Sequence, residues 1–395
     1  MSYLDILLDG VEVEWKTLGE VAEIYGGLTG KSKSDFESGN AKYISYKNIF
    51  FNVNVNYNIL EFVKISDSEN QHLVKYGDVL FTGSSETAEE VGMSSSVTTN
   101  FEESVYLNSF SFGVRFNEDI QLIPEFSKYL FRSKFMRTEI SRTASGVTRY
   151  NVSKARFKKL TIPIPPLNVQ TEIARILDTF AEITAELTAE LTARKTQYNY
   201  YREQLLSFDE GEVEWKTLGE VGEIKRGVAF TKKQAVFGRF PVVANASEPI
   251  CFHNELNRNG EFIVIARSGA NAGLISYWNE ELFLTDAFSI HPNDSVLNTK
   301  FAFYFLKKHQ REIHLMKEGS GVPHVRASDF EIYKIPVPSL EEQARIVSIL
   351  DKFDTLTTSI SEGLPKEIEL RKKQYEYYRD MLLNFNKLNI DDEKR

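Results

Sequence analysis

The segment VEWKTLGEVAEI at residues 13–24 returns as VEWKTLGEVGEI at residues 213–224, with 11 of 12 positions identical. Two further pairs of segments repeat in the same order: IPIPPLNVQTEIARILDTF (162–180) with IPVPSLEEQARIVSILDKF (335–353), and RKTQYNYYREQLLSF (194–208) with RKKQYEYYRDMLLNF (371–385). The blocks between the repeated segments are far less alike. The chain is therefore two copies of one plan: a variable block, a proline-rich hinge and a helical block.

The first residues extend this repeat around the ends of the chain. Asp5-Ile-Leu-Leu8 resembles the ends of both helical blocks, at residues 203–206 and 380–383. We therefore expect a circular, pseudo-twofold repeat whose termini lie close together. The predicted domains are an N-terminal segment that completes the distal helical region, two globular domains and two helical regions, at residues 1–16, 17–160, 161–212, 213–334 and 335–395.

The helical blocks carry apolar residues at alternating spacings of three and four, which is typical of a coiled-coil seam. The two stripes match each other position by position: Ile173, Ile176, Phe180, Ile183 and Leu187, and then Ile346, Ile349, Phe353, Leu356 and Ile360. Tyr198 and Tyr201 continue the first stripe, and Tyr375 and Tyr378 the second. Two long antiparallel helices are predicted, the second of them interrupted at Gly363-Leu-Pro365 because glycine and proline break helices.

The variable blocks are mixed, so each is predicted to be an α+β globule. Alternating runs at residues 41–44, 78–82 and 261–266 indicate strands, with glycine-rich turns between them. Short helices are expected over residues 124–139 and 298–316. The predicted fold class is thus α+β, with two globular domains separated by two long, antiparallel coiled-coil helical regions.

Composition excludes several classes of protein. A single cysteine, Cys251, rules out a disulfide framework and suits a reducing cytoplasm. No apolar run of about 18 residues occurs, so no membrane span is expected, and the acidic start lacks the basic region of a signal peptide. The net charge of −9 argues against a histone-like binder but allows a DNA reader with its basic residues on one face.

The sequence contains segments that resemble catalytic or ligand-binding motifs, but each of these motifs is incomplete. Gly26 to Gly30 leaves three residues where a phosphate-binding P-loop needs four before its Gly-Lys-Ser, so an exposed basic loop is favoured. The six histidines lack metal-ligand spacing, and no methyltransferase or nuclease motif is evident. We therefore expect a chain that is not an enzyme and that binds neither metal nor cofactor.

One stretch carries strong positive charge. Residues 126–160 contain ten lysines and arginines against Glu139 alone, and residues 300–334 contain seven against four acids. This pattern indicates phosphate contact, although a solvated basic helix would look the same. The polar turns at residues 143–151 and 319–326 could contact bases or simply close a sheet. The candidate DNA-binding residues are Lys31, Lys33, Arg132, Arg137, Arg142, Thr148, Arg149, Asn151, Lys158, Lys159, Lys232, Lys233, Arg267, His324 and Arg326.

Two tyrosines of the helical blocks lie outside the apolar seam. Tyr200 and Tyr377 occupy matching positions in the repeated Arg-Lys-x-Gln-Tyr-x-Tyr-Tyr-Arg block. Their neighbours on the seam are expected to pack between helices. Tyr200 and Tyr377 are instead candidates for contact with another protein.

Two variable globules alternating with two repeated helical blocks resemble the specificity subunit of type I restriction–modification enzymes. VEWKTLGE, the Ile-Pro-x-Pro…Gln hinge, Ile-Leu-Asp-x-Phe and the tandem Thr-Ala-Glu-Leu at residues 184–191 are similar to the type IC branch. The resemblance spans the chain and is specific in the helical blocks. It implies that each globule is a target-recognition domain reading one half of an asymmetric, bipartite double-stranded DNA sequence.

The resemblance also implies the partners of the chain. The helices would set the spacer and dock two modification subunits, which carry S-adenosylmethionine, and restriction subunits with ATP and Mg would join them. No base-contact residue can be carried over, because the globules are the variable part. A coiled-coil structural adaptor without a DNA role is the alternative, and a stand-alone nuclease or methyltransferase lacks its motifs.

Overall fold

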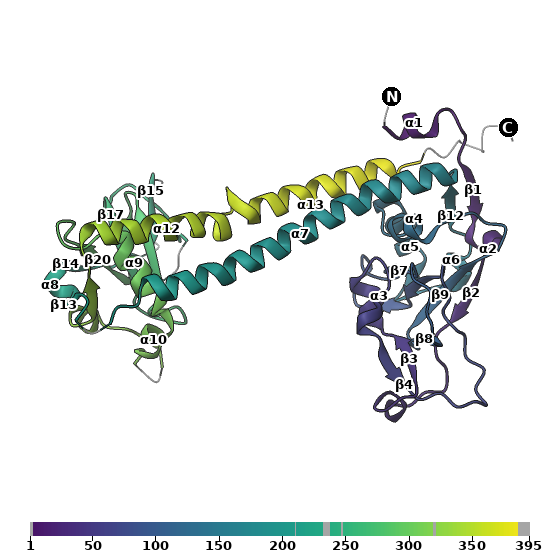
Figure 1. Cartoon of the computed structure of the whole chain (residues 1–395), viewed down its shortest axis with the longest axis horizontal. Helices are drawn as coiled ribbons and strands as arrows, with labels where there is room; N and C mark the ends of the chain where they lie inside the picture. Colours follow the sequence, from purple (N-terminus) through teal and green to yellow (C-terminus); the bar gives the residue numbers. More distant parts are fainter. Residues whose placement is uncertain (1–2, 210, 232–237, 246–247, 319–320, 386–395) are drawn as a thin grey trace. The chain divides into compact units, whose positions relative to one another are not determined.

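The computed structural model describes residues 3–209, 211–231, 238–245, 248–318 and 321–385, and the chain divides into two compact units (Figure 1). Unit 1 comprises residues 1–186 and 368–395, and unit 2 comprises residues 187–367. Helix α7 (Leu167–Leu205) runs from unit 1 into unit 2 without interruption. Each unit therefore joins one variable block to parts of both helical blocks.

Unit 1 contains three sheets that recur in unit 2, and one further sheet. The two-stranded sheet pairs β1 (Glu14–Thr17) with β12 (Thr161–Ile164). The four-stranded sheet has the order β2 (Ala22–Gly26), β9 (Ser111–Phe116), β5 (Val79–Thr82) and β7 (Ser94–Ser96). The three-stranded sheets have the orders β4 (Glu61–Val63), β3 (Ala41–Ile44) and β8 (Val105–Leu107), and β10 (Ala144–Ser145), β11 (Tyr150–Val152) and β6 (Ser84–Ser85). The helices of the globule are α1 (Tyr3–Leu8), α2 (Leu18–Val21), α3 (Tyr46–Phe51), α4 (Pro124–Leu130), α5 (Lys134–Arg142) and α6 (Lys154–Phe157), with short 3-10 turns at Lys33–Phe36 and Tyr57–Ile59.

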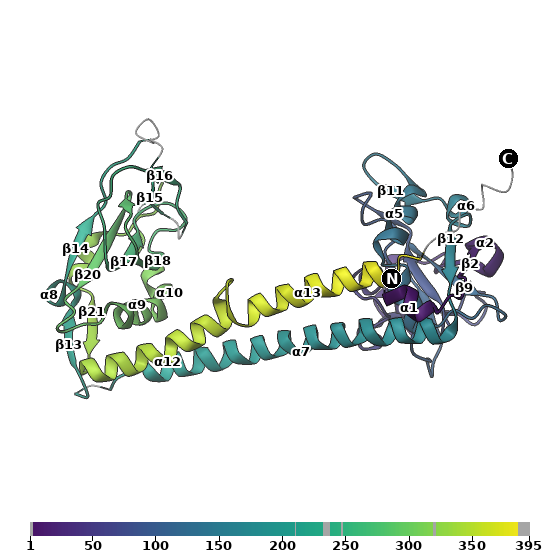
Figure 2. The same ribbon diagram turned by 90° about the horizontal axis from the view of Figure 1, so that it is seen from above.

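Unit 2 repeats this topology although its variable block is unlike that of unit 1. Strand β13 (Glu214–Thr217) pairs with β21 (Lys334–Val337). The four-stranded order is β14 (Gly222–Arg226), β20 (Ala287–Pro292), β17 (Glu261–Ala266) and β18 (Ile275–Asn279), and the three-stranded order is β16 (Cys251–His253), β15 (Phe240–Val243) and β19 (Phe283–Leu284) (Figure 2). The helices are α8 (Leu218–Val221), α9 (Thr299–Lys308), α10 (Gln310–Leu315), α11 (Ala327–Glu331) and α12 (Leu340–Thr358). Strand β3 in unit 1 and strand β15 in unit 2, each in the middle of its sheet, have one antiparallel and one parallel neighbour.

The elements expected from the sequence are present. The predicted strands correspond to β3, β5 and β17, and each predicted helix is resolved into two, α4 with α5 and α9 with α10. The α+β class is confirmed. Each four-stranded sheet packs against the two helices of its own globule, because Phe81 and Phe112 in unit 1 and Ile263 and Phe288 in unit 2 share a buried cluster with those helices.

A buried glutamine holds each proline-rich hinge. In unit 1 the amide nitrogen of Gln170 donates to the carbonyl oxygens of Gln121 and Pro165, both at 2.7 Å, and its amide oxygen accepts the backbone N–H of Ile123. In unit 2, Gln343 makes the same three hydrogen bonds, to Val296, Pro338 and Asn298. Because each amide group is fully buried and satisfied, the hinge joins the globule to its helix rigidly.

The long helices pair antiparallel within each unit, as predicted (Figures 1 and 2). In unit 1, Phe180 of α7 stacks on Tyr378 of α13 (Gly363–Leu382), with ring centroids 5.2 Å apart. In unit 2, Tyr198 and Tyr201 of α7 both stack on Phe353 of α12. Aromatic pairs thus continue the apolar seam of each helical block.

The second helical block is interrupted, as the sequence indicates. Helix α12 ends at Thr358 and α13 begins at Gly363, whose φ of +74° favours glycine. A Cβ atom on Gly363 would lie 2.4 Å from the carbonyl oxygen of Thr355. Ile360 falls inside this break and is 85% exposed, so its assignment to the seam was wrong. Its heptad position requires a continuous helix, and the chain leaves the helix before reaching it.

The two described ends of the chain meet in unit 1. Leu4 of α1 belongs to the same buried cluster as Leu382, Leu383 and Phe385 at the end of α13. The expected proximity of the termini is therefore confirmed for the described ends. Within the part of the chain that the structure describes, no helix combines the length and apolar character that crossing a membrane requires.

Candidate nucleic-acid interface

In unit 2, one end of the four-stranded sheet gathers basic side chains around a cleft. Arg226 ends β14, Arg267 directly follows β17, and Arg326 precedes α11 as its N-cap residue. His324 forms an antiparallel bridge with Ser268, which brings the polar turn against the end of β17. The four residues line an open cleft of about 560 Å³. Three of the predicted residues, Arg267, His324 and Arg326, are thus brought together by strands distant in sequence.

The charges of this cleft are only partly neutralised. The guanidinium of Arg326 pairs with Glu318, and that of Arg267 lies 4.0 Å from Asp286. Both arginines remain more than half exposed despite these contacts. An exposed ion pair contributes little to stability, so these guanidinium groups can exchange their carboxylate partners for phosphate or a base edge at small cost.

Behind the cleft, a buried arginine braces the end of β14. Arg258 donates hydrogen bonds to the carbonyl oxygens of Lys225 and Arg226 and to the hydroxyl of Ser289. Burial lowers its pKa from the usual value. Arg226 therefore extends from a fixed backbone into the cleft.

Unit 1 builds the matching turn as the sheet of β10, β11 and β6. Asn151 pairs with Ser84 directly after β5, as His324 pairs with Ser268 directly after β17. The guanidinium Nε of Arg149 donates a 3.0 Å hydrogen bond to Ser84 Oγ. The turn closes a sheet, as one of the two interpretations expects. Thr148, Arg149 and Asn151 stay exposed, and base contact by them stays a prediction.

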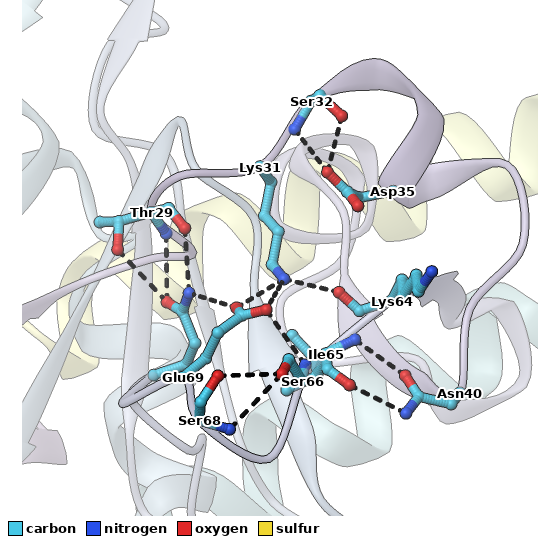
Figure 3. A network of polar contacts seen from close by, with 11 residues as sticks. Thr29, Lys31, Ser32, Asp35, Asn40, Lys64, Ile65, Ser66, Ser68 and Glu69 are labelled. Carbon is cyan, nitrogen blue, oxygen red and sulfur yellow. Dashed lines mark hydrogen bonds and ion pairs between the residues drawn. The ribbon is translucent and has the colours of Figure 1, made fainter.

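The expectation of a freely exposed basic loop was wrong for Lys31. Its side chain is only 4% exposed, and its ammonium donates to the carbonyl oxygen of Lys64 and to Glu69 (Figure 3). The hydrogen bond from Lys31 is the main reason that the pKa of Glu69 falls to about 2. Lys31 therefore fastens two loops together and does not reach phosphate, whereas Lys33 is exposed.

Arg132 and Arg137 were also wrongly assigned to phosphate. The guanidinium of Arg132 donates to the carbonyl oxygens of Ser94, Ile49, Phe50 and Asn52. That of Arg137 donates to Gly92, Glu89 and Val91 in the same way. Burial lowers the pKa of each to about 10. Arg132 thus satisfies carbonyl oxygens of α3, of Asn52 and of β7. Arg137 satisfies those of the turn before β7. The sequence could not reveal either set of partners.

The remaining basic candidates of unit 1 are exposed. Lys158 and Lys159 follow α6, and Arg142 ends α5 in an exposed ion pair with Glu139. Lys232 and Lys233 lie outside the described residues. The basic stretch thus offers fewer free cations than its composition suggests.

Tyr200 and Tyr377 are exposed as expected, at 61% and 65%. Each packs its ring edge against the following tyrosine, with centroids 5.5 Å apart in both pairs. The following tyrosine in turn stacks on the opposite helix, Tyr201 on Phe353 and Tyr378 on Phe180. Each exposed ring is therefore held in place on the outside of a fixed aromatic stack.

Two aspartates that connect the globules to the long helices were not predicted from the sequence. Asp178 of α7 accepts hydrogen bonds from Lys128 and Tyr129 of α4, and Asp351 of α12 accepts them from Lys300 and Tyr304 of α9. Each group ties a globule to its long helix. The sequence repeat could have shown their importance, because both aspartates lie in the repeated Ile-Leu-Asp-x-Phe segment.

Among the described residues, no three His, Cys, Asp or Glu side chains gather as metal ligands would.

Comparison with known proteins agrees with this architecture. A family model described as "Type I restriction modification DNA specificity domain" matches residues 10–194 and again residues 210–370. The chain is 34% identical over 420 residues to the Type I restriction enzyme EcoR124I/EcoR124II specificity subunit of Escherichia coli, covering 98% of each. It is 32% identical to the EcoprrI specificity subunit of E. coli over 392 residues, covering 92% of each.

Solved structures show the same fold. The S subunit of a type I restriction-modification system from M. genitalium superimposes with a TM-score of 0.59 at 20% identity, covering 96% of this chain and 98% of that one. A chain from a structure describing complex assembly and conformational transition of the type I R-M system gives 0.64 at 18% identity, covering 94% and 98%. These relationships give no support to a structural adaptor without a DNA role. The chain belongs to the type I restriction–modification DNA specificity subunit family, with one copy of the family domain in each half.

Proposed function

We propose that each unit reads one half of an asymmetric, bipartite double-stranded DNA target. The observation that carries this proposal is the repetition of one topology with different side chains at the same place. The turn after β5 is paired by Asn151 beside Arg149, and the turn after β17 is paired by His324 beside Arg326. Two readers of one shape with different hydrogen-bonding groups recognise different base sequences.

The helical blocks dock two modification subunits in this proposal. S-adenosylmethionine belongs to those subunits, and ATP and Mg to restriction subunits that join the complex. Tyr200 and Tyr377 support the docking role, since each places an exposed aromatic ring on a helix and tyrosine is enriched at protein interfaces. This chain itself performs no catalysis; transfer of a radiolabelled methyl group from S-adenosylmethionine to DNA by the isolated chain would contradict this.

The test exchanges residues 17–160 for the equivalent block of a relative with a different target. The chimera and the parent are each produced with their modification subunits, and the methylated sites are mapped in cellular DNA. One half-site should change while the other is kept. A change in both halves, with the chimera folded, would reject the assignment of one unit to one half-site.

Salt dependence of binding provides the second measurement. Phosphate contacts release counterions, so the affinity of the complex for duplex DNA should fall steeply with salt, with a log–log slope of about −0.9 per neutralised phosphate. A chain that only scaffolds other proteins would add nothing to the slope of the modification subunits alone.

A further inference from the structure

The turn that precedes β9 in unit 1 corresponds to the turn that precedes β20 in unit 2. Leu28 and Val228 donate backbone hydrogen bonds to Leu107 and Leu284, at the start of the respective turns. Gly83 and Arg267 then donate to the carbonyl oxygens at their last positions, Phe110 at 2.8 Å and Asp286 at 3.3 Å. Phe110 and Asp286 therefore occupy equivalent positions, although their side chains share no chemistry.

Both turns are clamped by a glycine with no room for a side chain. A Cβ atom on Gly27 would lie 1.9 Å from the carbonyl oxygen of Asn108, and one on Gly227 would lie 2.9 Å from that of Leu284. In unit 1, the amide nitrogen of Asn108 donates to the carbonyl oxygen of Ile44, and its amide oxygen accepts from the backbone N–H of Phe110 and the hydroxyl of Ser111. The backbone at Phe110 and Asp286 is thus fixed by contacts on several sides.

The side chain of Phe110 projects from this fixed turn and is 66% exposed. It lines an open cleft of about 590 Å³ together with Lys33, Lys47 and Tyr46. An exposed phenyl ring contributes nothing to the core of unit 1. Beside exposed lysines, it offers an apolar surface next to cations, which suits a base edge flanked by phosphates.

Asp286 stands among the arginines of the unit 2 cleft. Its backbone has a φ of +43°, a conformation that aspartate tolerates better than most residues. Its Oδ2 accepts hydrogen bonds from Ser268 and Asn245, at 2.6 and 2.7 Å. Within the described part of the chain, the other oxygen, Oδ1, has only Arg267 nearby, at 4.0 Å. The carboxylate is therefore oriented by one oxygen and keeps the other as an acceptor.

A carboxylate in a cleft for phosphates is unfavourable unless the ligand offers it a donor. Base edges in the major groove offer two such donors, the amino groups of cytosine and adenine. Apolar side chains at the same position instead favour the methyl group of thymine. The chemistry of Phe110 and Asp286 thus matches two different base pairs.

We propose that the turn preceding β9 and β20 is a base-reading position in each unit. Asp286 accepts a hydrogen bond from the amino group of a base in one half-site, with cytosine as the expected partner, and Phe110 contacts a thymine methyl group in the other. This inference rests on the proposed function and adds to it which residues determine specificity.

The test uses the complex of the full chain with its modification subunits and a duplex carrying the target mapped for the unaltered chain. Asp286→Asn keeps the size and the tolerance for positive φ but removes the charge and replaces one of the two acceptor oxygens with an amino donor. Its affinity for this duplex should fall by about 5- to 150-fold, the range of one base-specific contact. Discrimination should be relaxed at one base pair of one half-site, and the salt slope should stay unchanged.

For Phe110 the probe is a duplex in which uracil replaces thymine at single positions of the other half-site. Removing one methyl group should weaken binding by the unaltered chain at one position, and Phe110→Ala should abolish that difference. The matched controls are Glu280→Gln and Phe51→Ala, exposed residues of the same units that do not line these clefts. Both should bind as the unaltered chain does.

Three results distinguish a failure of the base-reading inference from a failure of the proposed function and from a folding defect. Unchanged discrimination by both folded variants, or an equal loss of affinity for every duplex, would overturn this inference and leave the proposed function intact. Absence of any target preference in the unaltered complex would overturn the proposed function itself. Phe110→Leu and Asp286→Glu keep the apolar or acidic character, so partial retention of discrimination by these variants supports base reading over a folding defect.

Discussion

The hydroxyl of Tyr129 donates a 2.6 Å hydrogen bond to Asp178, which ties α4 of the first globule to the helix that leaves it. Lys128 pairs with the same carboxylate oxygen. In unit 2 the hydroxyl of Tyr304 and the carboxylate of Asp351 are also 2.6 Å apart. The pKa of Tyr129 is raised, first by burial and then by Asp178, so its hydroxyl stays protonated and remains a donor. With the buried glutamine of the hinge, each globule is fastened to its helix at two places.

Asp178→Ala should therefore destabilise unit 1. The substitution leaves a buried hydroxyl and an ammonium without their acceptor, which costs about 2–4 kcal/mol in the free energy of unfolding. Urea denaturation followed by circular dichroism measures this loss. Glu182→Ala, an exposed position on the same helix, is the control and should change the free energy by less than about 0.5 kcal/mol. An equal effect of both substitutions would show that the aspartate does not fasten the globule.

Arg132→Ala tests the corrected role of the buried arginines. It removes the donors that satisfy four backbone carbonyls in α3, just after it and in β7, and we expect a loss of about 2–4 kcal/mol in the free energy of unfolding. The salt dependence of DNA binding should stay unchanged in the fraction that folds. Arg142→Ala removes an exposed guanidinium from the same stretch and should leave stability nearly unaltered. A flattened salt slope without loss of stability in Arg132→Ala would show that this residue contacts phosphate after all.

Lys158 and Lys159 remain the phosphate candidates of unit 1 because both are exposed. Single alanine substitutions should weaken binding to all duplexes by the same factor and reduce the salt slope by about 0.9 for each phosphate that is no longer neutralised. Titrations at several salt concentrations, with the mapped target and with unrelated DNA, measure both effects. Unchanged slopes in both variants would exclude the segment that follows α6 from the DNA-binding surface.

Most of the fold could be predicted from the repeated segments. Hinges, long helices and the break at Gly363 follow from proline, glycine and apolar spacing, which act locally. The sheet orders could not be predicted, because pairing such as that between β3 and β8 joins residues far apart in sequence. Ile360 was misplaced for a related reason: periodicity continues through a break that the chain itself does not follow.

The candidate site was predicted less well because charge alone does not reveal exposure. Lys31 and Arg132 have the same sequence character as Lys33 and Lys158, yet carboxylate or carbonyl partners occupy them. Those partners lie in segments distant in the sequence. Among the predicted residues, Arg267, His324 and Arg326 line one cleft, and contact between them and DNA stays a prediction. Asp286 and Phe110, the proposed base readers, were not among the sequence candidates because the search looked for positive charge and polar turns.

His291 gives unit 2 a stability that depends on pH. Burial, with Lys225 and Arg258 nearby and Glu223 opposing them, lowers its pKa from 6.5 to about 4. The folded unit therefore disfavours the charged ring, whose Nε2 lies 2.9 Å from Ser289 Oγ. The stabilising contribution of the neutral ring is complete above pH 6.5 and is lost as the pH falls toward 4.

His291→Gln should flatten the dependence of unit 2 stability on pH in this range. Thermal unfolding at about pH 7 and about pH 4.5 gives the two midpoints for each chain, and the difference between chains isolates the histidine from the carboxylates that titrate alongside. Asn279→Gln, an exposed position without a titrating group at the end of β18 in the same unit, is the control and should keep the pH dependence of the unaltered chain. Equal slopes in all three chains would show that the ring is not held neutral.

The last prediction concerns the tandem Thr-Ala-Glu-Leu at residues 184–191, which lies inside the uninterrupted helix α7. One more four-residue unit lengthens a helix by about 6 Å and turns it by about 400°, leaving a residual rotation of about 40°. The apolar face is then nearly preserved. Because duplex DNA rises about 3.4 Å per base pair, translation alone allows at most about two added pairs, and we expect one. Chains with one and three units, produced with their modification subunits, should methylate sites whose half-sites are one pair closer and one pair further apart. Inserting two residues instead rotates the following turn by about 200° and should destroy packing. An unchanged spacer in folded, active one-unit and three-unit chains would show that α7 does not measure the target.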